Sequence, residues 1–118
     1  MQTLTIYPSA ARTAAPTVPD LKNHQHRGVH VVIDITAGST LLLTFTIEGK
    51  DPLSSKYYTV LASASLTGTG TTVLRVFPGA TASANVTAND MIPENWRVNV
   101  AAGNGNSATY TVAACLLP

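Results

Sequence analysis

The chain has 118 residues, which is enough for one hydrophobic core and too few for two ordinary domains. Seven basic residues against six acidic ones give a formal net charge of +1, so we expect neither nucleic acid nor an anionic membrane as a partner. Only 11% of the residues are charged, against about 25% in ordinary soluble domains. A surface made instead of Thr, Ser, Ala and Asn indicates that much of it faces other protein.

The first part of the chain is predicted to form a strand followed by an extended arm. Residues 3–7 alternate in the manner of an edge strand. Three prolines follow within residues 8–27, and each fixes φ and removes a backbone donor, which excludes a central strand or a continuous helix there. We therefore divide the chain into an N-terminal strand and arm over 1–27 and a β-domain over 28–118.

From Gly28 onward, short runs rich in Val, Ile, Thr and aromatic residues are separated by Gly, Pro, Asn and Asp, which is typical of strands joined by turns. In chain order the predicted strands are 29–36, 41–48, 56–63, 71–77, 80–88, 96–100 and 107–116. The run 80–88 is the weakest, because its residues are small. The Asp-Pro turn after the second run and the Asn-Gly turn before the last one each predict a hairpin.

Within these runs the larger apolar side chains occupy alternate positions, so that one face of each strand packs inward. No window of roughly 11 residues has the apolar spacing of a helix. We expect an all-β fold, a β-sandwich or jelly-roll-like barrel of about seven to eight short antiparallel strands with an irregular N-terminal arm. The predicted core is Val31, Ile33, Phe45, Ile47, Val60, Leu74, Val76, Trp96, Val98, Tyr110 and Val112.

Residues capable of chemistry form no catalytic or metal-binding set that the sequence reveals. His24, His26 and His30 lie close together, but zinc needs three or four converging ligands, and the single Cys115 lies far away in an apolar run. The carboxylates are scattered, and neither a Gly-x-Ser-x-Gly elbow nor a phosphate-binding loop is present. We expect no enzyme activity, no cofactor and no metal.

The strings GVHVVIDIT, FTIEGKDPLSSKYYTVLASA, TTVLRVFPG, ENWRVNV and ATYTVAA resemble small structural proteins encoded among the head and tail genes of tailed bacteriophages. The resemblance covers residues 28–117 and rests on the strand pattern rather than on a chemical motif. It implies a β-sandwich protein of the head decoration (cement) type, or a small neck or tail component. Its implied location is the virion, assembled in the cytoplasm of the host bacterium, and it carries no catalytic residues over to this chain.

We therefore expect a virion structural protein, most directly a capsid decoration protein that binds and stabilises the capsid lattice. Its partners would be the major capsid protein or other virion proteins, together with copies of itself, a trimer being the first expectation. A minor tail or neck component, and a carbohydrate-binding host-surface adhesin, remain as alternatives, since exposed tyrosines can stack on sugars. The residues expected to contact partners are Arg12, Pro16, Pro19, Leu21, His24, His26, Arg27, Tyr57 and Tyr58.

Overall fold

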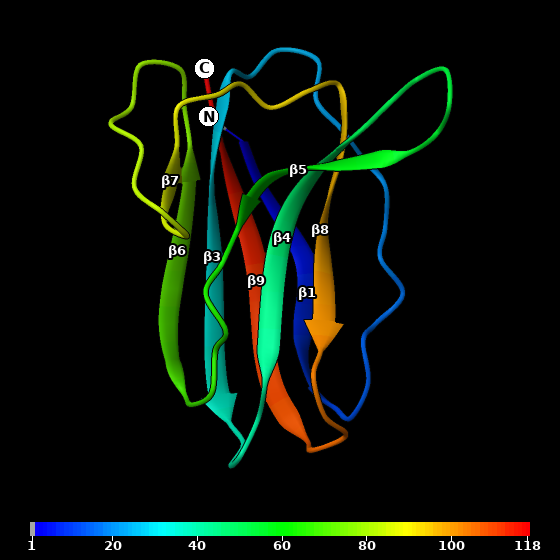
Figure 1. Ribbon diagram of the computed structural model, residues 1–118, viewed down its shortest axis with the longest axis vertical. Coiled ribbons are helices and arrows are strands. Elements are labelled where there is room, and N and C mark those ends of the chain that lie inside the picture. Colours follow the sequence, from blue (N-terminus) through cyan, green and yellow to red (C-terminus); the bar gives the residue numbers. More distant parts are fainter. Residues whose placement is uncertain (1) are drawn as a thin grey trace.

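Two β-sheets packed face to face form the computed structural model, which describes residues 2–118 (Figure 1). Sheet A has the strand order β1-β9-β3-β6-β7, and sheet B has the order β2-β8-β4-β5. In the part of the chain that the structure describes, no helix is long and apolar enough to cross a membrane. The strands are β1 (Gln2–Arg12), β2 (Leu21–Lys22), β3 (Gly28–Ala37), β4 (Leu43–Lys50), β5 (Tyr57–Ala62), β6 (Gly70–Val76), β7 (Thr87–Ala88), β8 (Asn95–Ala102) and β9 (Ala108–Leu117).

The strands pair from the ends of the chain inward. β1 pairs with β9, β2 with β8, β3 with β6 and β4 with β5, all antiparallel. β9 also pairs with β3, and β8 with β4, which completes the two sheets. This nested pairing is the topology of a jelly roll, and the predicted all-β sandwich is confirmed. The structure describes nine strands, against the expected seven to eight. The short β7 is the exception to the antiparallel pattern, because it runs parallel to β6.

The predicted alternation places the core correctly. Every predicted core residue except Val60 is buried between the sheets. Within this core the rings of Phe45 and Tyr110 meet edge to face, with centroids 5.4 Å apart. Val60 is only partly buried because a bulge in the β4–β5 ladder skips it. Leu61, opposite Ile47, fills the inward position instead.

The N-terminal strand is longer than the predicted 3–7, since β1 continues through Pro8 to Arg12. Register shifts before and after Tyr7 place Pro8 at an irregular point of an edge strand, where its missing N–H removes no bond from the centre of the sheet. The segment that follows contributes β2 to sheet B, with Leu21 opposite Trp96. The first 27 residues therefore add a strand to each sheet, and their irregular parts are 13–20 and 23–27.

The hairpin predicted between the runs 41–48 and 56–63 is present as β4 and β5, but the second predicted hairpin is wrong. The turn 103–107 reverses the chain, yet β8 lies in sheet B and β9 in sheet A, so the turn crosses between the sheets. β9 pairs instead with β1 and β3. An Asn-Gly turn fixes the local reversal of the chain, and the long-range ladders determine which strands pair.

The strand predicted over 80–88 is also largely wrong, because only Thr87 and Ala88 form a strand. The segment before them is a loop made of small, exposed residues. Asn85 adopts a positive φ of 62°, and the side chain of Asn89 accepts a 2.7 Å hydrogen bond from the Gly79 N–H. Local turn bonds therefore replace a ladder where no large side chain is available to be buried.

Candidate interaction site

Three loops at one end of the sandwich carry no charged residue. They are 38–42, 63–69 and 103–107, and we call them the neutral loop end (bottom of Figure 1). The loops are joined to one another: the side-chain amides of Asn104 and Asn106 each donate a 2.9 Å hydrogen bond to the Thr40 carbonyl. The backbones of Leu43 and Leu66 exchange two further bonds of 3.0 and 2.7 Å. The end is therefore one connected surface.

The neutral loop end is hollowed in two places. One hollow of about 350 Å³ lies between Gly38–Thr40 and Asn106–Ser107, and a second of about 310 Å³ lies between Ile35 and the loop 65–70. Hydroxyl, amide and backbone groups line both. Because removing charges from water is costly and these groups carry none, this end can be covered by another molecule more cheaply than a charged surface.

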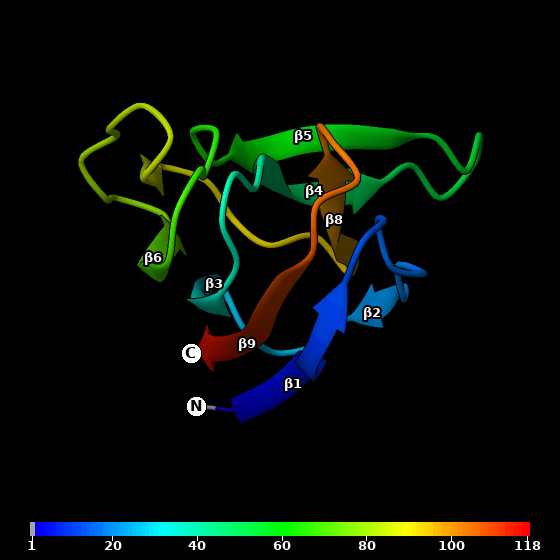
Figure 2. The ribbon, with the colours of Figure 1, turned by 90° about the horizontal axis from the view of Figure 1, so that it is seen from below.

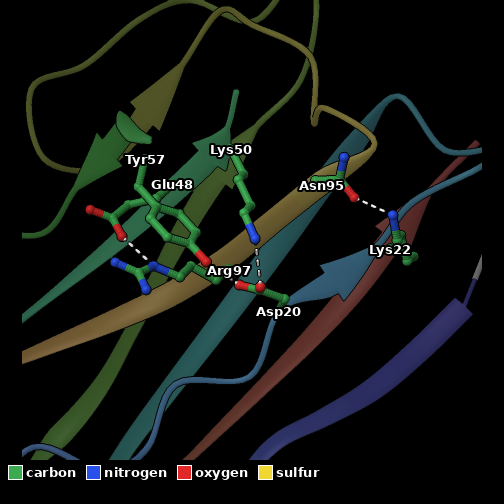
Figure 3. Close-up of polar contacts among 7 residues, drawn as sticks. All are labelled: Asp20, Lys22, Glu48, Lys50, Tyr57, Asn95 and Arg97. Atoms are coloured by element: carbon green, nitrogen blue, oxygen red, sulfur yellow. Dashed lines mark hydrogen bonds and ion pairs between the residues drawn. The ribbon is translucent and has the colours of Figure 1, made fainter. Parts of the chain in front are cut away.

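Most charged side chains lie away from these loops, and several of them lie on the outer face of sheet B (Figure 3). Arg12, opposite Ala108, and Asp34, opposite Thr71, are the exceptions near the neutral loop end. Arg97 on β8 donates from Nε to Glu48 Oε1 on β4 at 2.7 Å. The guanidinium carbon of Arg97 lies 3.4 Å from the centroid of the Tyr57 ring on β5. Three neighbouring strands are thus linked across their outer face by one arginine.

Asp20 connects the segment before β2 to this cluster. Its carboxylate accepts hydrogen bonds from Tyr57 Oη at 2.5 Å and from Lys50 Nζ at 3.1 Å. The bond from Tyr57, and then the one from Lys50, lower the pKa of Asp20, and the carboxylate in turn raises the pKa of Lys50. A further bond joins Lys22 to the side chain of Asn95. These groups bond to one another, and the arrangement fastens the 13–20 segment to sheet B.

Two of the predicted partner-binding arginines are bound to their own domain. Arg12 donates to the carbonyls of Pro8 and Tyr110 at 2.7 and 3.1 Å, and its guanidinium lies 4.6 Å from the Tyr110 ring centroid. Arg27 lies 5.6 Å from the ring centroid of Phe77. Both side chains therefore support the body of the sandwich rather than extending as part of a separate arm.

The remaining predicted arm residues lie at different depths. Leu21 packs partly against the core, Pro16 and His26 are half-buried, and Pro19 and His24 are exposed. Among residues 2–118, no group of three or more His, Cys, Asp or Glu side chains could hold a metal ion.

Sequence reasoning missed Asn23, whose buried side chain fixes the turn that contains the histidines. It donates to the carbonyls of His26 and Ile92 at 2.6 and 3.1 Å, and it accepts from the His26 N–H at 3.0 Å. An Asn followed by a turn is a sequence signal that could have indicated this role.

Tyr57 and Tyr58 do not form a joint aromatic platform, since neighbouring strand residues point to opposite faces. The Tyr57 ring is covered by Arg97 and its hydroxyl is bonded to Asp20. The Tyr58 ring covers Gly49 next to Pro93 and is 49% exposed. Only Tyr58 therefore offers an open aromatic surface.

The fold and this surface together define a jelly-roll domain with a neutral, hollowed loop end and with most of its charged residues elsewhere. The chain matches no family model, no curated protein and no solved structure.

Proposed function

We propose that this chain is a virion structural protein of a tailed bacteriophage, a head decoration (cement) protein that binds the capsid lattice in many copies. The observation that carries the proposal is that the three loops of the neutral loop end hold no charged residue, whereas most charged residues, of both signs, lie elsewhere in the domain. Depletion of charge is characteristic of the buried centre of protein interfaces. We assign the neutral loop end as the surface that meets the shell.

The jelly-roll body supports this role. Jelly rolls serve as rigid building blocks in viral capsids and also as lectins. The long edge strand β1 and the edge strand β5 leave backbone groups available for pairing with neighbouring subunits. Because many copies would occupy equivalent sites on one lattice, each contact can be weak and the assembly still stable. We propose no catalytic function, cofactor or metal.

Binding to assembled heads tests the proposal. Ser39 and Thr67 are exposed residues of the neutral loop end whose side chains make no hydrogen bond within residues 2–118, so Ser39→Glu and Thr67→Glu introduce charge without removing a hydrogen bond. We expect each variant to cosediment about tenfold less with heads assembled from the major capsid protein of the same genome. Thr81→Glu and Ala82→Glu, on an exposed loop at the other end, are matched controls that should bind like the wild type.

Different results would contradict the proposal in different ways. A wild-type protein that does not cosediment with heads rules out the decoration role, and immunogold labelling confined to tails or necks would move the protein there. Specific binding on a glycan array, lost on Tyr58→Ala, would support the adhesin instead. Deleting 9–27 cannot serve as a test, because it removes the last part of β1, residues 9–12, and all of β2, and so damages both sheets.

A further inference from the structure

The β4–β5 hairpin presents the most exposed large apolar side chain in the part of the chain that the structure describes. Leu53, at its tip, is 94% exposed. The hairpin projects beyond the body of the sandwich, on the side opposite the loop 78–86 (Figures 1 and 2). A leucine held in water gains none of the transfer free energy that burial would give it, so its position favours a partner that covers it.

The turn that carries Leu53 is fixed in shape. The carboxylate of Asp51 accepts hydrogen bonds from the Leu53 N–H and the Ser54 hydroxyl, both at 2.9 Å. Its backbone carbonyl accepts from Ser55 at 2.9 Å, and its N–H donates to the Lys56 carbonyl at 2.8 Å. Ser55 holds a positive φ of 64° within this network. Because the turn is already ordered, binding through Leu53 requires little further loss of conformational entropy.

A second apolar surface lies at the same end of the molecule. Tyr58 is 49% exposed and Met91 is 53% exposed. The Tyr58 ring and Pro93, which belongs to the same loop as Met91, both lie against Gly49. Asp90 and Glu94 are exposed on that loop. We call Tyr58, Met91, Pro93, Asp90 and Glu94 the acidic seat, and we call Leu53 with the exposed Lys56 the hairpin tip. Among residues 2–118, the only side-chain ion pairs are Lys50–Asp20 and Arg97–Glu48, so Lys56, Asp90 and Glu94 are available for others.

We propose that two copies of this chain form a reciprocal contact, in which the hairpin tip of each copy lies on the acidic seat of the other. A two-fold contact requires complementary halves on the same chain. The tip offers Leu53 and the ammonium group of Lys56, with the Asp51 carboxylate turned to the backbone of its own loop, and the seat offers apolar side chains with the carboxylates of Asp90 and Glu94. The chain's own hollows are lined mainly by Ser, Thr, Gly and Asn and offer Leu53 no apolar pocket. A membrane is a poorer partner, because one leucine is flanked by polar and charged groups.

The contact is small. One leucine and its surroundings on each side cover less than the roughly 1,000 Å² of a stable interface, so association in dilute solution is weak. On a lattice that holds many copies side by side, the same contact becomes effective through the high local concentration. Self-association can nevertheless be measured without any lattice, which separates this inference from the proposed function.

Sedimentation equilibrium of the purified chain, from micromolar to millimolar concentration, tests whether two copies associate. We expect the wild type to dimerise with rising concentration and Leu53→Asp to weaken dimerisation by about tenfold or more. Because Leu53 is almost fully exposed, the melting temperature of the variant should equal that of the wild type. Val86→Asp is the matched control: it places the same charge at an exposed apolar position on another loop and should leave dimerisation unchanged.

A charge swap tests which surfaces meet. Lys56→Glu alone and Glu94→Lys alone should each weaken the dimer several-fold, since like charges then face each other. The double variant should recover wild-type affinity, because both copies carry the exchanged pair. Failure of the wild type to self-associate overturns the inference, and so does a dimer that is unaffected by Leu53→Asp. A dimer weakened by Leu53→Asp without rescue in the double variant places the tip elsewhere than on the acidic seat and overturns it as well.

Discussion

The hydroxyl of Tyr7 in sheet A donates a 2.7 Å hydrogen bond to the carbonyl of Val98 in sheet B, and both residues are buried. It is a polar connection between the two layers inside an otherwise apolar core. Tyr110 also has a buried hydroxyl, but that hydroxyl has no hydrogen-bond partner among residues 2–118. Removing the hydroxyl oxygen from each tyrosine in turn should therefore change the free energy of unfolding by different amounts.

Tyr7→Phe should lower the free energy of unfolding by about 1–2 kcal/mol, since it removes the bond and leaves the Val98 carbonyl unpaired in the core. Tyr110→Phe should change it by less than about 0.5 kcal/mol or stabilise the protein slightly, because no bond is lost. Urea unfolding of the two variants gives the comparison. Equal losses would mean that the hydroxyl of Tyr7 does not bridge the sheets.

Alkaline pH should destabilise the fold through the same residue. Burial raises the pKa of Tyr7 to about 12 from its ordinary 10.0, so folding favours the protonated form. The resulting stability is fully present below pH 10 and is lost as the pH rises through the folded value near 12. Unfolding midpoints measured between pH 8 and 12 should fall for the wild type and fall less for Tyr7→Phe. The remaining dependence should come in part from Tyr110, whose pKa burial also raises, and from Lys50, whose pKa the hydrogen bond to Asp20 raises.

Acid should release the segment that Asp20 fastens. The hydrogen bonds from Tyr57 and Lys50 lower the pKa of Asp20, so its contribution to stability is present above the ordinary value of 3.8 and is lost as the pH falls through the lowered one. Asp20→Asn should be less stable than the wild type at pH 7, and this difference should vanish at strongly acidic pH. A difference that stays constant from neutral to acidic pH would show that the charge of Asp20 is not what holds the segment.

Arg97 is expected to stabilise sheet B through its planar group rather than through charge alone. Arg97→Lys keeps the positive charge but loses the stacking on Tyr57 and the bond from Nε to Glu48, and should cost about 1 kcal/mol. Arg75→Lys, the same change at an exposed position on β6, should stay within about 0.5 kcal/mol of the wild type. Thermal unfolding of both variants distinguishes the two effects.

Gly28 should tolerate no side chain. A Cβ atom there would lie 2.5 Å from the carbonyl oxygen of Val76 and against the Phe77 ring, so Gly28→Ala should destabilise the fold by about 1–3 kcal/mol. At Gly68 the same atom would meet nothing within 4 Å, and Gly68→Ala should be close to neutral. If both variants unfold at the same urea concentration, the close approach of β3 to the end of β6 is not as described.

The sequence predicts the layers of this fold better than its connections. Alternation places Ile33, Phe45 and Trp96 inward because one face of a strand packs into the core and the other faces water. The alternating apolar and polar residues of each strand show which face is which. Alternation does not record the partner of a strand. For that reason the turn 103–107 was predicted to close a hairpin, although it crosses between the sheets.

The interaction surfaces were predicted least well. Asp20 and Tyr57 lie 37 positions apart in the sequence and meet only because β2 docks beside β8, so no local pattern indicates their bond. The sequence suggested an arm from 8 to 27 because prolines exclude a central strand, but an edge strand with a bulge accommodates Pro8. Charge composition indicated a contact surface without locating it, and the three uncharged loops converge only in the folded chain.

The position of β9 between β1 and β3 also governs when the molecule can form. Residues 108–117 are synthesised after all the other strands. Gln2 therefore cannot pair with Leu116, its partner in the β1–β9 ladder, until β9 has been made. Until then β1 has no partner and β3 is paired only with β6, so both present open strand edges that can pair with other chains. Sheet A can therefore be completed only after residues 108–117 have been made, and newly made copies are most prone to aggregation before that point.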